Sequence, residues 1–202
     1  MPCRLPIVAC CFVCVALPLA FACGGSGAST PRTYVNQDYG FALTYPGSYE
    51  QVETKQNAIL QQMDFATTLA DPGSVDEAKS HHEVVDALLV AASRFPEAMS
   101  EAQAQEVLRQ TKSQLAGLSG DVPQTGYYDV TATPGTITTM DGAPCLEAEL
   151  SYANADGARL HDKLYMIISG DLYIALQATA AEDRWPQSGP TLEGIAASFR
   201  LL

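Results

Sequence analysis

The pattern of apolar and polar positions is clearest in the last third of the chain. Apolar residues fill every second position of Leu146–Tyr152, with Glu147 and Glu149 between them, which predicts a strand with one buried face. The alternation resumes at Leu160–Ile168, and a further apolar strand is predicted over Leu172–Thr179. Leu164–Ile168 and Leu172–Leu176 are apolar at odd and even positions alike, so we expect this part of the sheet to be covered on both faces.

The register between the first two of these strands follows from parity, because their apolar faces are both even-numbered. Matching them requires a three-residue loop, 155–157, that pairs Asn154 with Ala158. Gly157 then occupies the left-handed position that such a loop needs. The same register predicts that Glu149 faces Lys163.

A helix is predicted over Glu101–Ala116. Ser100 and Gln103 form a capping box at its start, and Gly117 is predicted to end it in a left-handed conformation. A second helix is predicted over Pro190–Ala197, with Leu192, Ile195 and Ala196 as its buried residues. The buried stripe of the first helix consists of Ala104, Val107, Leu108, Thr111 and Leu115.

The N-terminal half is less regular. Short strands are predicted at 34–36 and at Phe41–Tyr45, where Pro46 and Gly47 follow as a turn. Residues 52–69 fit a helix or a strand. Residues 74–94 also carry both signals, and the compact apolar run Val84–Ala92 favours a strand there. The chain ends in a short predicted strand, 199–201.

The first 22 residues have the layout of a secretory signal, with Arg4 before an apolar run and small residues at its end. Ala22-Cys23 resembles a bacterial lipobox, in which the cysteine receives a diacylglycerol and becomes the mature N-terminus. We therefore predict a signal peptide at 1–22, a flexible linker at 23–32 and one domain at 33–202. A protein held by this lipid lies on the extracytoplasmic face of the cell membrane. An ordinary cleaved signal and an uncleaved anchor are the alternatives.

The chain is acidic, with a formal net charge of −12. Removing the leader removes Arg4 and no acidic residue, so the mature charge is one unit more negative, −13. This charge argues against nucleic acid and anionic headgroups as partners. Five of the six cysteines lie at or before Cys23, so the domain is left with Cys145 and no internal disulfide.

The domain begins with the frame Tyr34…Tyr39-Gly40-Phe41-Ala42-Leu43-Thr44-Tyr45-Pro46, continues with a helix and an antiparallel meander, and ends with Ile195-Ala196-Ala197-Ser198-Phe199. This arrangement resembles the PsbP-like fold. That fold is named for an extrinsic photosystem II subunit, and bacterial lipoproteins also contain it. The resemblance implies an α+β domain, a single α/β/α sandwich with a twisted, mainly antiparallel sheet, and a binding or assembly role. Family members often carry tryptophan after the Pro-Gly turn, where this chain has Ser48-Tyr49.

The densest group of ligand-type residues is His81-His82-Glu83 with Asp86. On a helix, His82 and Asp86 would share a face and begin a metal site. The sequence supplies no third ligand at a clear spacing, so a solvated polar segment is the favoured interpretation and no metal is expected.

Cys145 and His161 are a possible nucleophile and base. The predicted register places Cys145 opposite Ile167, about 20 Å along the strand from His161, so we expect no dyad. Tyr49 and Trp185 are candidate contact aromatics, although a lid over the core is the favoured role for Trp185. No glycine loop that binds phosphate opens a helix, and no cofactor is expected.

These observations predict a lipid-anchored, non-catalytic module that binds an envelope protein or a small ligand. The alternatives are an envelope hydrolase with an unrecognised site and a metal-binding lipoprotein that uses His82, Glu83 and Asp86.

Overall fold

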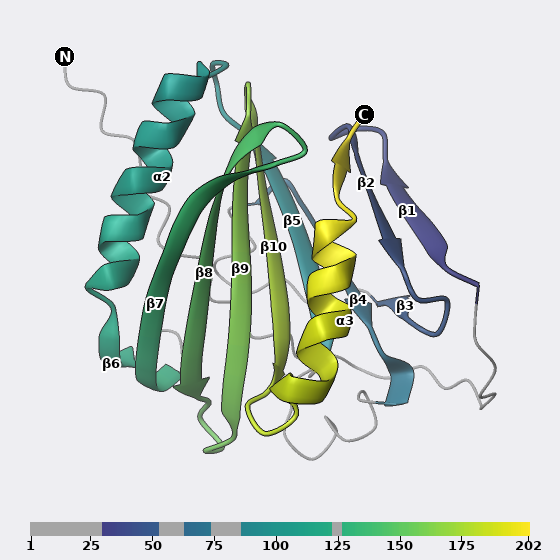
Figure 1. The fold of residues 1–202 in the computed structure, drawn as a ribbon, viewed down its shortest axis with the longest axis vertical. Coiled ribbons are helices and arrows are strands. Elements are labelled where there is room, and N and C mark those ends of the chain that lie inside the picture. Colours follow the sequence, from purple (N-terminus) through teal and green to yellow (C-terminus); the bar gives the residue numbers. More distant parts are fainter. Residues whose placement is uncertain (1–29, 53–62, 74–85, 123–126) are drawn as a thin grey trace.

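The computed structural model describes residues 30–52, 63–73, 86–122 and 127–202. An eight-stranded sheet forms its centre, and every strand pair in it is antiparallel (Figure 1). In spatial order its strands are β3 (Glu50–Val52), β4 (Phe65–Ala70), β5 (Ala87–Arg94), β10 (Leu172–Ala181), β9 (Arg159–Ser169), β8 (Ala143–Ala153), β7 (Tyr127–Met140) and β6 (Ser119–Val122).

A second, three-stranded sheet brings the two ends of the described domain together. Its order is β1 (Arg32–Asn36), β2 (Phe41–Tyr45) and β11 (Arg200–Leu201). The last strand therefore pairs with the second one, and Phe41 and Phe199 stack in the core beneath them, with ring centroids 6.0 Å apart.

The large sheet is covered on both faces at β9 and β10, as their sequence pattern predicts. Helix α2 (Glu101–Ala116) packs on β7, β8 and β9 over one apolar core. Helix α3 (Trp185–Ala197) and the small sheet cover β5 and β10 over the other. Residues of β9 and β10 enter both cores alternately, which explains why those strands are apolar at both parities. The fold is thus α+β, with a mostly antiparallel sheet.

The meander register agrees with the prediction from parity. Ala148 pairs with Leu164 and Glu149 with Lys163. The Asn154 N–H donates to Ala158 O at 2.9 Å, which closes the three-residue loop. Gly157 has φ +81°, the left-handed conformation expected there.

The first helix also agrees with its prediction, except at its end. The Ser100–Gln103 capping box is present, and Ala104, Leu108 and Leu115 are buried. Gly117, however, has φ −89° and ψ −4°, so the predicted left-handed cap is wrong. Its N–H donates to Gln114 O at 3.1 Å, and a tight right-handed turn leads directly into β6.

The last helix begins earlier than its prediction. It starts at Trp185, and Pro190 lies inside it. Pro186 occupies the first turn, where a missing N–H leaves no helical bond unmade, so it starts the helix in place of Pro190. Trp185 is consequently part of the helix rather than of the preceding loop.

The two segments with mixed signals resolve as strands where the structure describes them. β4 covers the end of 52–69 and extends to Ala70, and β5 confirms the strand favoured over Val84–Ala92. Residues 53–62 and 74–85, like the predicted signal peptide and most of the linker, lie outside the described residues. Among the helices of the described part, none is long and apolar enough to cross a membrane.

Candidate functional site

His161 and Trp185 stack where strand β9 meets the start of helix α3. Their ring centroids lie 4.1 Å apart, with an interplanar angle of 35°. The same indole covers Gly189, where a Cβ would lie 2.9 Å from Trp185 Cε2. Trp185 is therefore packed between β9 and the backbone of its own helix, at the rim of the core that α3 covers.

The imidazole of His161 is partly buried between Trp185 and strand β8. Ser151 lies directly opposite it on β8, with Ser151 Oγ 3.4 Å from His161 Nδ1. The other ring nitrogen, Nε2, is buried and has no hydrogen-bond partner in the described structure. Burial lowers the pKa of His161, while the nearby carboxylates of Glu149, Glu182 and Glu193 act in the opposite direction. The neutral imidazole is thus the form that the fold favours.

Ser151 and His161 do not make a working nucleophile and base. Ser151 lies within β8 and is paired with Thr131 on one side and His161 on the other. An acyl-transfer site needs backbone N–H groups aimed at a developing oxyanion, and the backbone here belongs to the sheet. The pair instead fixes the position of Trp185, and through it the start of α3.

Cys145 is sealed in the core. It is 0% exposed and faces Ile167 across the β8–β9 ladder, as its register predicts. Burial, with Glu147 as a lesser cause, raises the pKa of the thiol to about 12. A thiol with that pKa is not a nucleophile at neutral pH. The same register separates Cys145 from His161, because His161 pairs with Ser151, six residues further along β8.

Asp86 forms an ion pair that links the start of β5 to the start of α3. Its Oδ2 lies 2.8 Å from an Nη atom of Arg184, and its backbone is left-handed, with φ +63°. The other candidate metal ligands, His81, His82 and Glu83, lie outside the described residues. Within the described ranges, no group of three or more histidine, cysteine, aspartate or glutamate side chains is placed to hold a metal ion.

Tyr49 lies close to this ion pair and is only 4% exposed. Burial raises its pKa, and the charges of Asp71 and Asp86 add to the effect. Its ring belongs to the core beneath the small sheet. Tyr49 therefore stabilises the fold and presents little surface to a partner.

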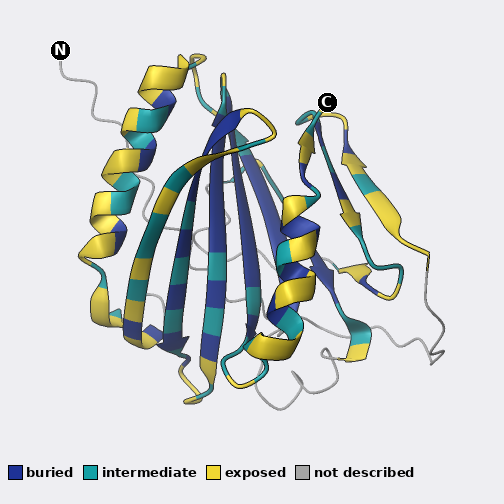
Figure 2. Cartoon of the chain, viewed as in Figure 1, coloured by how far each residue is buried: buried dark blue, intermediate teal, exposed yellow. Residues whose placement is uncertain are grey.

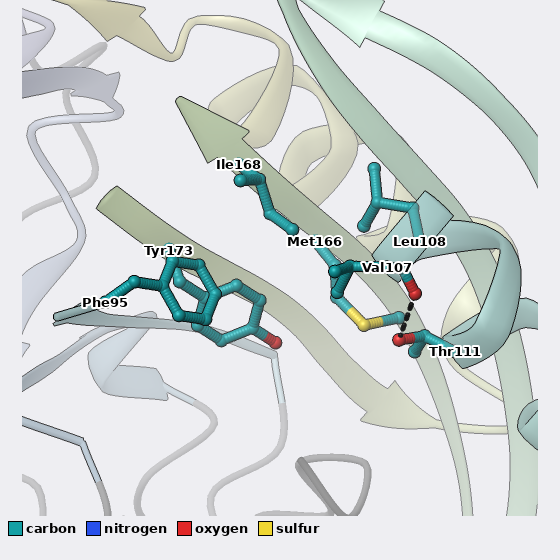
Figure 3. A pocket seen from close by; sticks show the side chains of 7 residues that line it. All are labelled: Phe95, Val107, Leu108, Thr111, Met166, Ile168 and Tyr173. Carbon is teal, nitrogen blue, oxygen red and sulfur yellow. Dashed lines mark hydrogen bonds between the residues drawn. The ribbon is translucent and has the colours of Figure 1, made fainter. Parts of the chain in front are cut away.

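A small apolar cavity lies between α2 and the sheet (Figure 3). Its volume is about 20 Å³, and within it Thr111 Oγ1 donates to Val107 O at 3.0 Å. That volume is enough for about one water molecule, whereas small-molecule sites are typically about 300–1,000 Å³. The lining residues are Phe95, Val107, Leu108, Thr111, Met166, Ile168 and Tyr173.

The α3 side of strands β7 and β8 is polar and partly exposed, and we call it the open face. Figure 2 shows exposed and intermediate residues along these strands, where β5 and β10 are almost wholly buried. Lys163 of β9 borders it and is ion-paired with Glu193 of α3 at 3.2 Å. The open face is lined by Thr131, Thr133, Glu147, Glu149 and Ser151.

No protein-family model matches this sequence, and no curated protein matches it either. Among solved structures, the solution structure of cyanobacterial PsbP (CyanoP) from Synechocystis sp. PCC 6803 is similar, with a TM-score of 0.60 and 19% identity over 90% of this chain and 98% of that one. A crystal structure from Bacteroides thetaiotaomicron VPI-5482 has a TM-score of 0.52 and 9% identity over 84% of this chain and 48% of that one.

LpqN of Mycobacterium tuberculosis, described as involved in cell envelope biogenesis, matches with a TM-score of 0.42 and 12% identity over 87% of this chain and 86% of that one. The last likeness is too low to carry an argument. The first confirms the predicted PsbP-like fold, and at 19% identity it establishes the fold alone.

Proposed function

We propose that this chain is a non-catalytic module, anchored by a lipid on Cys23 to the extracytoplasmic face of the membrane, that binds another protein of the cell envelope. The Ala22-Cys23 junction supports the anchor. The placement of α2 and α3 on opposite faces of the large sheet supports the α/β/α sandwich that accompanies a binding or assembly role in this fold.

The observation that carries the proposal is the way the reactive side chains are used. The Cys145 thiol is sealed in the core, His161 is stacked on Trp185, and Asp86 is paired with Arg184. Each of these groups fixes one element of the fold against another. Groups committed in this way are not available to bind or activate a substrate.

The cavity between α2 and the sheet favours a protein over a small ligand as the partner. At about 20 Å³ it is more than tenfold smaller than the usual small-molecule site. The open face, in contrast, offers an extended surface of threonine and glutamate side chains beside α3. A surface of that kind suits another polypeptide.

Crosslinking in intact cells tests this function. Affinity capture of the full chain after crosslinking should recover an envelope protein, and Thr133→Arg on the open face should reduce its yield at least about tenfold. Ser113→Arg, on the exposed side of α2, is the matched control and should leave the yield unchanged. Equal yields from both variants would count against the proposal. An enzymatic activity that no substitution on the open face reduces would also count against it.

A further inference from the structure

Within the part of the chain that the structure describes, no strand pairs with the outer edge of β1 in the small sheet. It is a terminal strand, and its five residues pair with β2 without a register shift. It begins with the charged Arg32, and from Thr33 to Asn36 it contains no proline and no charged side chain. An edge of this kind presents unpaired main-chain groups to another strand.

The other terminal strands are protected. β3 has only three residues, and β6 has four residues and a register shift. β11 has two residues, and its Leu201 N–H donates to Asp141 Oδ2 at 2.7 Å. The part of β7 that extends past its pairing with β6 contains Pro134 and a second register shift. Short length, charge, proline and bulges are the usual means of blocking an edge.

The hydrogen bonds of β2 show which groups of β1 point outward. The Thr44 N–H donates to Ser198 Oγ at 2.7 Å, and Gly40 O accepts from the Leu202 N–H at 2.9 Å. The even-numbered residues of β2 therefore bond on the β11 side. Because bonded and non-bonded pairs alternate in an antiparallel ladder, Thr33, the partner of Thr44, does not bond to β2.

It follows that the N–H and C=O groups of Thr33 and Val35 point away from the sheet. Their side chains also leave the core: Thr33 is exposed, and Val35 is 47% exposed. Tyr34 and Asn36 turn inward, where Tyr34 joins the aromatic cluster. β1 thus offers two donors, two acceptors and two β-branched side chains on one accessible edge.

We propose that β1 pairs with β1 of a second copy of this chain. In an antiparallel arrangement centred on Tyr34, Thr33 lies opposite Val35 of the partner subunit, and Val35 opposite Thr33 of the partner subunit. All four outward groups of each strand are then satisfied, and the two small sheets become one six-stranded sheet.

A second copy suits this edge because the edge is self-complementary. The two outward residues, Thr33 and Val35, are two positions apart. In the antiparallel arrangement, each therefore lies opposite an outward residue of the second copy. Both pairs bring β-branched side chains together, which favours cross-strand packing. Arg32 lies opposite Asn36 of the partner subunit, so no like charges face each other. The pairing does not depend on the lipid anchor or on the open face.

Disulfide formation between two variants that each carry one added cysteine tests the register. T33C and V35C full-length chains with tags of different size are co-expressed, and the intact cells are treated with a mild oxidant. Their Cα atoms would lie about 5.5 Å apart across the pair, within disulfide range. Two copies of T33C would place these atoms about 8–9 Å apart, beyond that range. The chain with only its own cysteines gives the background.

We expect a mixed disulfide dimer at least about fivefold above either variant alone. Adding Thr33→Pro to the V35C chain removes an outward donor at a position where an edge strand tolerates proline, and should reduce the dimer. A circular-dichroism spectrum like that of the parent would show that this chain still folds. A mixed dimer no stronger than the single-variant controls, or a crosslink to another protein, would overturn the proposal.

Discussion

Ser151 and His161 lie directly opposite each other across β8 and β9, with 3.4 Å between Ser151 Oγ and His161 Nδ1. The three-residue loop that ends at Gly157 sets this pairing, since it fixes the register of the whole ladder. The pairing places His161 beneath Trp185, so a turn at one end of the meander decides how α3 begins.

The low pKa of His161 predicts a loss of stability in mild acid. Burial keeps this pKa below the value of about 6.5 for an unfolded histidine, so the unfolded chain takes up a proton before the folded one does. The contribution of the neutral His161 to the free energy of unfolding is fully present above about pH 6.5, and it is lost as the pH falls towards the folded pKa. Urea midpoints of the wild type should fall between pH 7.5 and 5.5, and His161→Gln should flatten this dependence. An unchanged slope would contradict the assignment.

The contact between Trp185 and Gly189 predicts a substitution whose effect changes sign. Gly189→Ala places a methyl group against the indole and should lower the free energy of unfolding by about 1–3 kcal/mol. In a Trp185→Ala background the same change should raise it by up to about 1 kcal/mol, because alanine favours helix. Gly194→Ala, which meets nothing within 4 Å, is the control and should stabilise both backgrounds. Denaturant unfolding of the set measures the coupling.

The meander loop predicts a difference between two neighbouring changes. Gly157 has φ +81° and open space around its Cα, so Gly157→Val acts through backbone strain alone. We expect it to cost about 1–2 kcal/mol more than Ala155→Val, which lies in the same exposed loop. Thermal unfolding compares the two. Equal losses would show that the loop does not depend on its left-handed position.

The sealed Cys145 thiol predicts protection from alkylation in the folded state. At pH 8 its pKa of about 12 and its burial should leave it unmodified by iodoacetamide for hours. After denaturation, and without a reducing agent, mass spectrometry of the mature protein should find one modified thiol. Rapid labelling of the native protein, or a Cys145-linked dimer as the main isolated form, would be inconsistent with the fold.

Much of the C-terminal half follows from the sequence because parity and one glycine determine it. Even-numbered apolar faces on both strands exclude a two-residue turn, and Gly157 favours the three-residue loop, which also pairs Ser151 with His161. The register therefore already implies the contact between them, although the sequence suggests His161 only as a possible base for Cys145, a pair that the same register excludes. The stack on Trp185 was not accessible, because it depends on a helix that starts five residues before Pro190.

The errors share a physical cause, since both arise where a glycine or proline has two possible uses. Gly117 ends its helix in a right-handed turn although glycine permits the left-handed one. Pro186 and Pro190 are both compatible with a helix start, and the packing of Trp185 on His161 and Gly189 places the start at the first. Long-range packing decides such cases, and a local pattern does not contain it.

The central claim is that this module is held at the membrane through Cys23, and metabolic labelling with a fatty-acid analogue tests it most directly. The wild-type chain should take up the label and sediment with membranes. Cys23→Ala should lose the label, and Cys145→Ala, which leaves the junction intact, should retain it. Label that persists in Cys23→Ala, or a wild-type chain that is never labelled, would contradict the account.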